Sequence, residues 1–374
     1  MKILVLVHEF PPIGGGGGRA AYDICRGLVK RGHQITVLTA RMKGQPASEL
    51  LSGVKVIRVW SFRRQVFRAS LLSMFAYIAV GIFSGYRTIR EVQPDVIHCH
   101  FAVPAGALGW MLSRLTGTPY LLTVHLGDVP GGVPEKTDRW FRWLFPFTPP
   151  IWKRARKVVA VSEYTCRLAE QYYPVSMEII PNGVELDQLD LIPQQIHAPV
   201  QLLFAGRFMP QKNPIQSINI LAQLIDLPWN CSMIGDGPLL NDVKKLSKDL
   251  GLFDRIKFTG WVTPEEVLDH LSKADILLMP SLSEGLPVIG VQALSKGLAL
   301  VVSRVGGFIE LVEEGKNGYL IEPADLTGFV SSLRELLTNS SKLSEFRRAS
   351  LLKAWVYDLD KVVSRYEGVL LESQ

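Results

Sequence analysis

Short apolar runs bounded by turn residues alternate with longer helix-compatible stretches along almost the whole chain. The runs are KILVLVHE, QITVLTA, VKVIRVW, PDVIHCH, PYLLTVH and KVVAVSE, and then VQLLFAGR, WNCSMIGDG, RIKFTG, ADILLMP and LALVVSR. Strands that are apolar on both faces are typical of a parallel sheet covered by helices on both sides. Because the pattern restarts near Val200, it predicts two α/β domains, each a doubly wound parallel sheet.

The length of 374 residues fits this division, since a domain takes roughly 150 residues. We predict an N-terminal domain over 1–185 and a C-terminal domain over 186–354. The seam is expected in 186–199, which is polar, contains two prolines and has no sustained period. The first run is interrupted by Glu9 and a double proline, so it predicts a buried strand and not a signal sequence.

Composition excludes several classes of protein. With 47% hydrophobic and 20% charged residues, the chain is neither disordered nor fibrous. Its four cysteines lie far apart, and no C-x-x-C pair occurs, so they predict neither a disulfide framework nor a thiolate zinc site. We therefore expect a reducing, cytoplasmic compartment. The cysteines are Cys25, Cys99, Cys166 and Cys231.

Charge is distributed unevenly beneath the net value of +6. Residues 1–185 carry 23 Lys and Arg against 12 Asp and Glu, whereas the remainder carries 18 against 23. A basic half (+11) and an acidic half (−5) suggest different partners. The basic half is expected to face something anionic, such as lipid headgroups, a phosphorylated acceptor or nucleic acid.

One apolar stretch reaches the lower length limit for a membrane span. Residues 69–86 contain no charge over eighteen positions. A weakly polar stripe at helical spacing crosses it, and arginines lie on both sides, so no positive-inside asymmetry orients it. We expect a buried or surface-inserting helix. The stripe consists of Ser70, Ser73, Tyr77, Gly81 and Ser84.

A second stretch, residues 136–157, mixes aromatic and basic side chains. It contains Trp140, Phe141, Trp143, Phe145, Phe147 and Trp152. Amphipathic rings and cations suit a membrane interface, but they also suit a packed helix with a solvated rim. Both interpretations stay open, and the first predicts peripheral membrane contact.

Five glycines, Gly14 to Gly18, follow the first strand and precede a helix expected near Arg19. Glycine lets a ligand approach the backbone, and a helix N-terminus favours negative charge, so a phosphate-facing loop is one interpretation. A flexible turn is the other. The spacing is not G-x-G-x-x-G, and no acidic residue closes the second strand at Thr39 to Arg41, which disfavours NAD.

In the second half, Gly206 and Arg207 end the first strand, and Lys212 follows five residues later. Two cations at the carboxyl end of a first strand lie where open α/β sheets bind ligands and could hold a diphosphate. The turn at 235–238 is better explained structurally.

Two other signals are set aside as metal sites. His98 and His100 share one face of a strand but have no evident third ligand. Asp358 and Asp360 form a D-x-D within a segment expected to be helical and exposed.

Seven motifs in order then point to a family. GGGGGRAA, TVHLGD, VSEYT, PNGVE and GRFMPQKN precede the stretch 281–323, in which SEGLPVIGVQ and VGGFIELVEEGKNGYLIEP stand out. Together they resemble the retaining glycosyltransferases of family four. The resemblance implies the GT-B fold, two facing Rossmann-like domains with an interdomain cleft, and a C-terminal segment (355–374) that crosses back to the first domain.

The resemblance also implies the reaction and its residues. A sugar would pass from a nucleotide-sugar donor, bound by the second domain, to an acceptor hydroxyl, bound by the first, with retention and without metal or cofactor. Arg207 and Lys212 would neutralise charge on the departing diphosphate. Glu284 opens the Glu, seven residues, Glu motif and would accept hydrogen bonds from donor-sugar hydroxyls. The second glutamate is replaced by Gln292, whose amide oxygen can still accept from ribose.

The remaining positions follow from the same resemblance. Backbone N–H groups of Gly285 and Leu286 would face the diphosphate, and His125 would hydrogen-bond a donor hydroxyl without abstracting a proton. Asp128 would orient His125 or the acceptor. The donor set is completed by Gly15, Gly16, Gly17, Gly206, Pro287, Val288 and Val262, and Arg19 joins the acceptor or orienting set.

The expected acceptor is lipid-linked, glycan or otherwise anionic, at the cytoplasmic membrane face, in cell-envelope glycan or glycolipid synthesis. Nucleic acid is not expected as a partner. Two alternatives stay open. One is a catalytically silent nucleotide- or glycan-binding module, with which the change at Gln292 is compatible, and the other is a sugar-nucleotide epimerase or an α-glucan phosphorylase-like enzyme on the same architecture.

Overall fold

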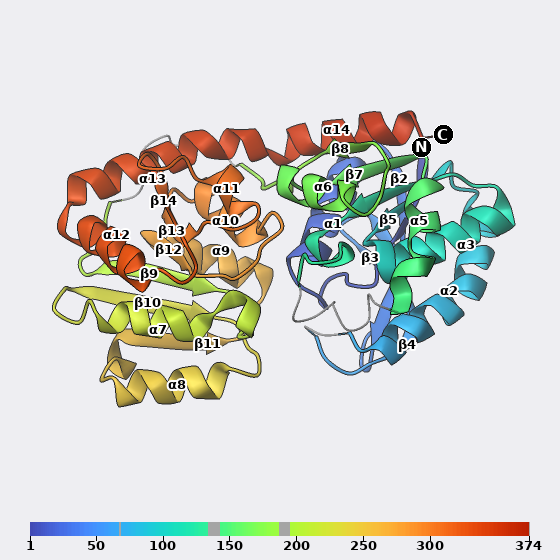
Figure 1. Ribbon diagram of the computed structural model, residues 1–374. Coiled ribbons are helices and arrows are strands. Elements are labelled where there is room, and N and C mark those ends of the chain that lie inside the picture. Colours follow the sequence, from blue (N-terminus) through green and yellow to red (C-terminus); the bar gives the residue numbers. More distant parts are fainter. Residues whose placement is uncertain (67–68, 134–142, 187–194, 374) are drawn as a thin grey trace. The chain divides into compact units, whose positions relative to one another are not determined.

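The computed structural model describes residues 1–66, 69–133, 143–186 and 195–373, which form two compact units (Figure 1). Unit 1 comprises Met1–Gly183 and Leu359–Gln374, and unit 2 comprises Val184–Asp358. We predicted a division after residue 185 and a return near residue 355. The expected seam lies largely outside the described residues, as do Trp140 and Phe141.

Unit 1 is built on an eight-stranded sheet in the order β3-β4-β2-β1-β5-β6-β7-β8. The strands are β1 (Lys2–Leu6), β2 (Gln34–Met42), β3 (Ser48–Leu51), β4 (Val54–Arg63), β5 (Val96–His100), β6 (Tyr120–Val124), β7 (Lys157–Ala160) and β8 (Met177–Ile179). All neighbours pair in parallel except β3, which is antiparallel to β4. The apolar runs predict six of these strands, all except β3 and β8.

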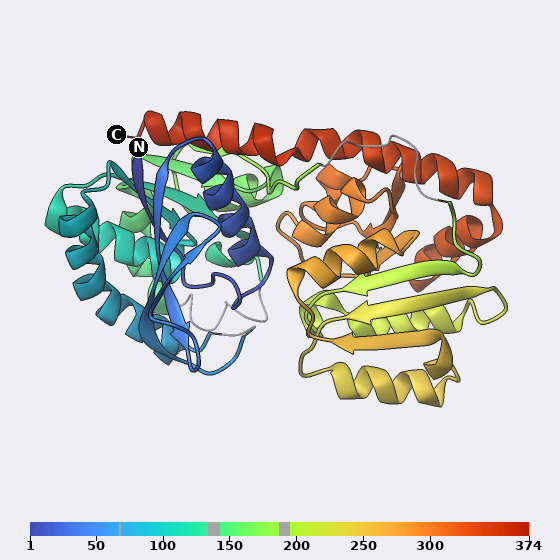
Figure 2. The ribbon, with the colours of Figure 1, turned by 180° about the vertical axis from the view of Figure 1, so that it is seen from behind.

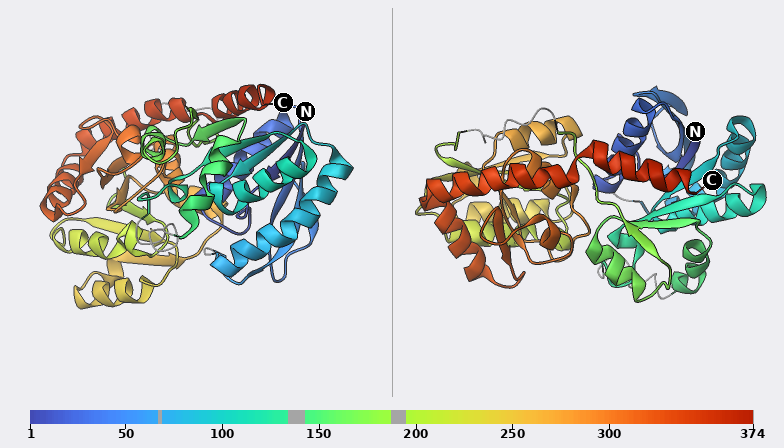
Figure 3. Two further views of the ribbon diagram at one scale, coloured as in Figure 1. Left: turned by 45° about the vertical axis from the view of Figure 1, so that its right-hand side comes forward. Right: turned by 90° about the horizontal axis from the view of Figure 1, so that it is seen from above.

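Helices cover both faces of this sheet, as Figures 2 and 3 show. They are α1 (Gly16–Lys30), α2 (Leu71–Val92), α3 (Ala107–Thr116), α5 (Pro149–Lys153), α6 (Glu163–Glu170) and α14 (Leu359–Leu371). Alternate residues of β1 belong to different cores: Leu4 packs with α2, α3 and α5, whereas Ile3 packs with α1 and α14. This alternation is the physical reason why the strand is apolar throughout.

Helix α2 realises the predicted helix of residues 69–86 and extends six residues beyond it. The Ser70 side chain caps it by accepting a hydrogen bond from the Ser73 amide at 3.1 Å. The helix is long and apolar enough to cross a membrane, and 39% of its most apolar window is buried inside the protein. The weakly polar stripe lies on the buried side, where Ser73, Tyr77 and Gly81 are inaccessible.

Unit 2 has a six-stranded parallel sheet in the order β11-β10-β9-β12-β13-β14. Its strands are β9 (Val200–Ala205), β10 (Trp229–Ile234), β11 (Ile256–Gly260), β12 (Ile276–Met279), β13 (Ala299–Ser303) and β14 (Gly318–Ile321). In chain order this is 3-2-1-4-5-6, the Rossmann arrangement, in which ligands bind where the strand order reverses. That switch point lies between β9 and β12.

The helices of unit 2 are α7 (Pro214–Ala222), α8 (Leu240–Asp249), α9 (Pro264–Ser272), α10 (Val288–Ser295), α11 (Phe308–Leu311), α12 (Leu326–Thr338) and α13 (Ser340–Ala354). Helix α9 shows how local sequence fixes an end: Thr263 and Glu266 form a capping box, and Pro264 occupies the first turn. The chain then continues from α13 into α14, which belongs to unit 1.

Candidate functional site

Lys212 and Glu284 form an ion pair at the switch point of unit 2. Lys212 Nζ lies 2.6 Å from Glu284 Oε1 and 2.7 Å from Oε2. The carboxylate is buried, and only 15% of the lysine side chain is exposed. Two residues to which the resemblance assigns donor chemistry are thus in direct contact, although 72 positions separate them.

Two further hydrogen bonds hold their loops together. Lys212 ends a short 3₁₀ turn after β9, and Glu284 lies between β12 and α10. Gln211 joins these loops with two hydrogen bonds. Its side-chain amide donates to Ser283 O at 3.0 Å, and its backbone carbonyl accepts from the Leu282 amide at 2.8 Å. The lysine stem also crosses Gly206, where an added Cβ would lie 3.4 Å from Lys212 Cγ.

Two glycines that the sequence analysis did not single out, Gly306 and Gly307, pack against the backbone of Glu284 and Gly285. Gly306 has φ +51°, and a Cβ there would come within 1.6 Å of Glu284 O. The amide of Gly307 donates to Gly285 O at 2.6 Å. The turn after β13 therefore packs its bare backbone against the loop that carries the carboxylate.

Gly306→Ala is accordingly expected to destabilise unit 2 by more than about 3 kcal/mol and to weaken ligand binding at Glu284. Gly315 supplies the matched control, since it also has a positive φ of +73° but no atom within 4 Å of an added Cβ. Gly315→Ala should cost only the backbone strain, about 1–2 kcal/mol. Thermal unfolding of both variants tests this prediction, and equal losses would contradict it.

The other predicted residues of unit 2 follow β9 and β11 or lie in and before α10. Arg207 directly follows Gly206 at the end of β9 and is half-buried. Gln292 is half-buried one turn before the end of α10, and Val262 is half-buried after β11. Leu286 and Pro287 are buried in the loop that leads into α10, whereas Gly285 and Val288 are partly accessible. The structure records no side-chain bond of Gln292 to Glu284.

The turn at 235–238 has the structural role that we predicted. Gly235 has φ +125°, and an added Cβ would lie 2.0 Å from Gly206 O. An added Cβ on Gly237, which has φ +158°, would lie 2.6 Å from Phe208 O. This turn shapes the backbone from which Arg207 projects.

In unit 1, Asp128 positions the segment that contains His125. Its Oδ2 accepts from the His125 amide at 2.8 Å, and its Oδ1 accepts from the Ala102 amide at 2.8 Å. These bonds tie the end of β6 to the end of β5. The buried carboxylate thus fixes the backbone of His125 directly after β6.

His125 stacks on Phe101, with ring centroids 4.2 Å apart. Phe101 adopts φ +73°, which is uncommon for a bulky residue. His125 Nε2 is buried and has no hydrogen-bond partner among the described residues. Desolvation lowers the pKa of His125 to about 4, opposed by the Glu9 carboxylate, so the ring is neutral near pH 7. A neutral ring can exchange a hydrogen bond with a hydroxyl and is a weak base.

The glycine loop is structured by close approach. Helix α1 begins at Gly16, three residues earlier than expected. An added Cβ on Gly17 would lie 2.5 Å from Phe101 Cζ, and one on Gly18 would lie 2.5 Å from Glu9 O. Gly15, in contrast, has nothing within 4 Å of an added Cβ, so the N-terminus of α1 is open there.

Glu9 and Arg63 are site residues that the sequence analysis missed. Arg63, whose side chain is fully buried, lies 3.2 Å from Glu9 Oε1 and also donates to Val66 O at 2.9 Å. Glu9 Oε2 accepts from the Gly15 amide at 3.3 Å. Arg19 pairs with Asp23 on the same helix at 3.0 Å, so its guanidinium is engaged within α1.

The two histidines of β5 are buried beside this site. His98 and His100 have ring centroids 4.2 Å apart, and His98 Nε2 contacts Thr123 Oγ1 at 2.8 Å. Desolvation lowers the pKa of His98 to about 3 and that of His100 well below its ordinary value. Within the described ranges, no three His, Cys, Asp or Glu side chains are grouped to hold a metal ion.

The four cysteines are all buried, and none forms a disulfide.

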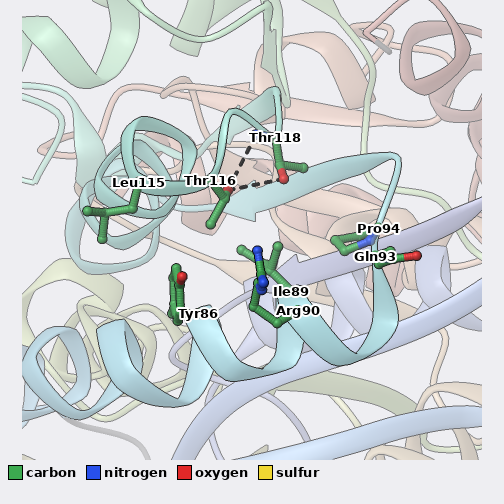
Figure 4. Close-up of a pocket in the computed structure, with 8 residues that line it drawn as sticks. All are labelled: Tyr86, Ile89, Arg90, Gln93, Pro94, Leu115, Thr116 and Thr118. Atoms are coloured by element: carbon green, nitrogen blue, oxygen red, sulfur yellow. Dashed lines mark hydrogen bonds between the residues drawn. The ribbon is translucent and has the colours of Figure 1, made fainter.

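Two described cavities of unit 1 lie away from the candidate residues, at the amino ends of its strands. The larger, about 490 Å³, is lined by Tyr86, Ile89, Arg90, Gln93, Pro94, Leu115, Thr116 and Thr118 (Figure 4). Because the candidate residues lie at the carboxyl ends, this cavity is not assigned to their chemistry.

Two family models match adjacent parts of the chain. The model described as Glycosyltransferase Family 4 matches residues 14–188, and that described as Glycosyl transferases group 1 matches residues 192–351. Between them they span nearly all of both units.

Curated relatives of known name are also similar. The chain is 29% identical over 275 residues to the Escherichia coli UDP-Gal:alpha-D-GlcNAc-diphosphoundecaprenol alpha-1,3-galactosyltransferase, covering 68% of this chain and 69% of the relative. It is 25% identical over 379 residues to a glycogen synthase of Mycobacterium tuberculosis, covering 94% and 89%.

Solved structures share the fold. Sucrose-phosphate synthase from Thermosynechococcus elongatus superposes with a TM-score of 0.83 at 17% identity and 98% coverage of both chains. HepE of Anabaena in complex with UDP and glucose superposes with a TM-score of 0.79 at 18% identity and 99% coverage. The two-unit architecture is therefore the GT-B fold.

Proposed function

The chain belongs to the glycosyltransferases of family four, and we propose that it is a retaining, metal-independent enzyme. In this proposal it moves a sugar from a nucleotide-sugar donor to an acceptor hydroxyl. Unit 2 binds the donor and unit 1 binds the acceptor. The observation that carries the proposal is the Lys212–Glu284 pair at the β9/β12 switch point, with Arg207 on the adjacent backbone.

The pair suits a diphosphate next to a sugar. An ammonium has three N–H donors, of which Glu284 engages two, so one is available for a phosphate oxygen. The Glu284 carboxylate neutralises Lys212, and Arg207 then supplies the net positive charge that a departing diphosphate requires. Glu284 retains lone pairs that accept hydrogen bonds from sugar hydroxyls. These two cations take the place of a metal in the proposed mechanism.

The reaction step is a front-face displacement. The acceptor oxygen forms a bond to the anomeric carbon as the bond from that carbon to the phosphate oxygen breaks. The acceptor proton passes to the departing phosphate. His125 is suited to a hydrogen bond with a hydroxyl and not to proton abstraction, because desolvation keeps its pKa at about 4.

The proposed acceptor is lipid-linked or otherwise anionic, at the cytoplasmic face of a membrane. The support is the +11 charge of residues 1–185 and the E. coli relative, whose name specifies a diphosphoundecaprenol-linked acceptor. Cell-envelope glycan or glycolipid synthesis is the proposed context. UDP-sugars are the first donors to test, because HepE was solved with UDP and glucose.

Incubation of the purified protein with a panel of nucleotide sugars, with and without candidate lipid-linked acceptors, tests the proposal. We expect release of the nucleoside diphosphate, with a product linkage whose anomeric configuration in the NMR spectrum equals that of the donor. Addition of EDTA is expected to leave the rate unchanged, since Arg207 and Lys212 carry the charge stabilisation. A rate that falls with EDTA and returns with Mg²⁺ or Mn²⁺ would overturn metal independence, and absence of any release would favour the silent binding module.

A further inference from the structure

Helix α2 differs from an ordinary surface helix, because its outward side is apolar as well as its inward side. A surface helix normally turns its apolar stripe inward and its polar side chains outward. In α2 the inward side combines small or weakly polar residues with core side chains such as Tyr77 and Ile89, and the outward side is also apolar for four turns. The exposed apolar residues of α2 are Leu71, Leu72, Phe75, Phe83 and Tyr86.

The inward side is fully used in packing. A Cβ on Gly81 would lie 2.6 Å from Leu108, and a Cβ on Gly85 would lie 2.6 Å from Leu112, so α2 and α3 approach closely. Tyr77 donates to Leu38 O at 2.9 Å. Rotation of α2 about its axis would break these contacts, so the outward rings are fixed in their exposed positions. Phe75 is 71% and Phe83 80% exposed.

Neighbouring elements in the same layer continue the pattern. Leu115 at the end of α3 is 61% exposed. The segment before α5, which packs with α3 on the same core, exposes Trp143 and Phe147. Large apolar side chains that gather on one layer mark an interaction surface, whereas scattered ones do not. We call these residues with the outward side of α2 the α2 face.

The charges on these segments have one sign. Residues 71–92, 107–116 and 143–156 contain six cations, Arg87, Arg90, Arg114, Lys153, Arg154 and Arg156. They contain one acidic residue, Glu91, which pairs with Arg87 at 2.6 Å. All six cations are exposed.

Figure 4 shows how cationic and apolar groups meet at one end of the α2 face. Arg90 and Tyr86 line the cavity of about 490 Å³ together with Leu115. Across it, the Thr116 and Thr118 hydroxyls are hydrogen-bonded at 3.1 Å. A cation and hydroxyls beside an exposed leucine provide a suitable surrounding for a phosphate at the edge of an apolar phase.

We propose that the α2 face binds the surface of a bilayer that contains anionic phospholipid. The phenyl rings of α2 enter the acyl boundary, Trp143 lies at headgroup depth, and the arginines contact lipid phosphates. A second copy of this chain fits less well, because a two-fold interface would oppose this face to itself and bring like charges together. The proposal deepens the membrane-linked acceptor above by naming the surface.

Flotation with vesicles tests the proposal with the full-length protein. The parent is expected to float with vesicles of phosphatidylcholine and phosphatidylglycerol, and weakly with phosphatidylcholine alone. Phe75→Ser/Phe83→Ser should lower the partition coefficient by roughly tenfold per ring. Arg90→Glu/Arg114→Glu should abolish the preference for the anionic vesicles. Because these side chains are exposed, the melting temperature should not change.

Ile225→Ser and Lys316→Glu are the matched controls, since both residues are exposed on unit 2. They should float like the parent. Release of nucleoside diphosphate without vesicles reports the chemistry separately and should be equal in all variants. Flotation of Phe75→Ser/Phe83→Ser at the parent level would overturn the proposal. The proposal would also be overturned if the parent protein floated with neither vesicle type, sedimented as a dimer, and became a monomer with these substitutions.

Discussion

Lys212→Met is expected to lower the rate of nucleoside diphosphate release by about 100- to 1,000-fold, the loss typical when one preorganised charge donor is removed. The ammonium lies 2.6–2.7 Å from both oxygens of Glu284 at the switch point of unit 2. In the proposed reaction it stabilises charge that develops on the diphosphate as the bond breaks. Because that charge grows toward the transition state, the loss should appear mainly in kcat.

The same substitution leaves Glu284 buried without its partner, which costs roughly 3–5 kcal/mol of stability. The double variant Lys212→Met/Glu284→Gln separates the two effects, since it removes both charges. It should recover most of the melting temperature but none of the activity. Lys316→Met serves as the control, because the Lys316 side chain is 73% exposed.

Arg207→Ala should reduce turnover by orders of magnitude in the same assay, because the proposed reaction uses its guanidinium to neutralise charge on the departing diphosphate. Recovery of activity in the double variant, or turnover near the parent value in Arg207→Ala, would contradict the assigned roles of the two cations.

Acid is expected to unfold unit 1 along a steep pH profile. Three buried histidines, His98, His100 and His125, have pKa values below the ordinary 6.5, because desolvation disfavours their charged forms. The unfolded chain therefore binds three protons that the folded unit excludes once the pH falls below about 6. The stabilisation is complete above the unfolded pKa and is lost as the pH falls.

Each excluded proton changes the free energy of unfolding by about 1.4 kcal/mol per pH unit, so the three histidines contribute about 4 kcal/mol per pH unit between about pH 6 and pH 4. His100→Leu should reduce this slope by one proton, because it removes one of the three titrating rings. The substitution breaks no hydrogen bond among the described residues, since neither ring nitrogen of His100 has a partner there. Hydrogen exchange of the β5 and β6 amides in a pH series measures the slope. His270→Asn, in unit 2, is the control, and an unchanged slope in His100→Leu would contradict the account.

Hydrophobic patterning was sufficient to predict most of both sheets. The central strands of unit 1 are apolar on both faces, because neighbouring residues such as Ile3 and Leu4 enter different cores on the two sides of the sheet. β3, β8 and β14 were not predicted, since each is a strand of three or four residues at the edge of its sheet, with a single neighbouring strand. The early start of α1 was also missed, because glycine disfavours helices and only close approach to Phe101 and Glu9 explains its presence there.

Much less of the candidate site was predictable from local sequence. The resemblance selected Lys212 and Glu284, but their contact depends on Gln211 bonds to another loop. The role of Gly306 depends on a carbonyl 22 residues earlier, and the Glu9–Arg63 pair joins segments 54 residues apart. Such long-range approaches leave no periodic signal in the chain.

Hydrogen–deuterium exchange of the full-length protein with and without UDP tests the central claim most directly, because it reports where a nucleoside diphosphate binds. The account predicts protection in residues 206–213 and 282–292 of unit 2, and loss of that protection in Lys212→Met/Glu284→Gln. Protection confined to unit 1, at the glycine loop or at the cavity beside Arg90, would contradict it.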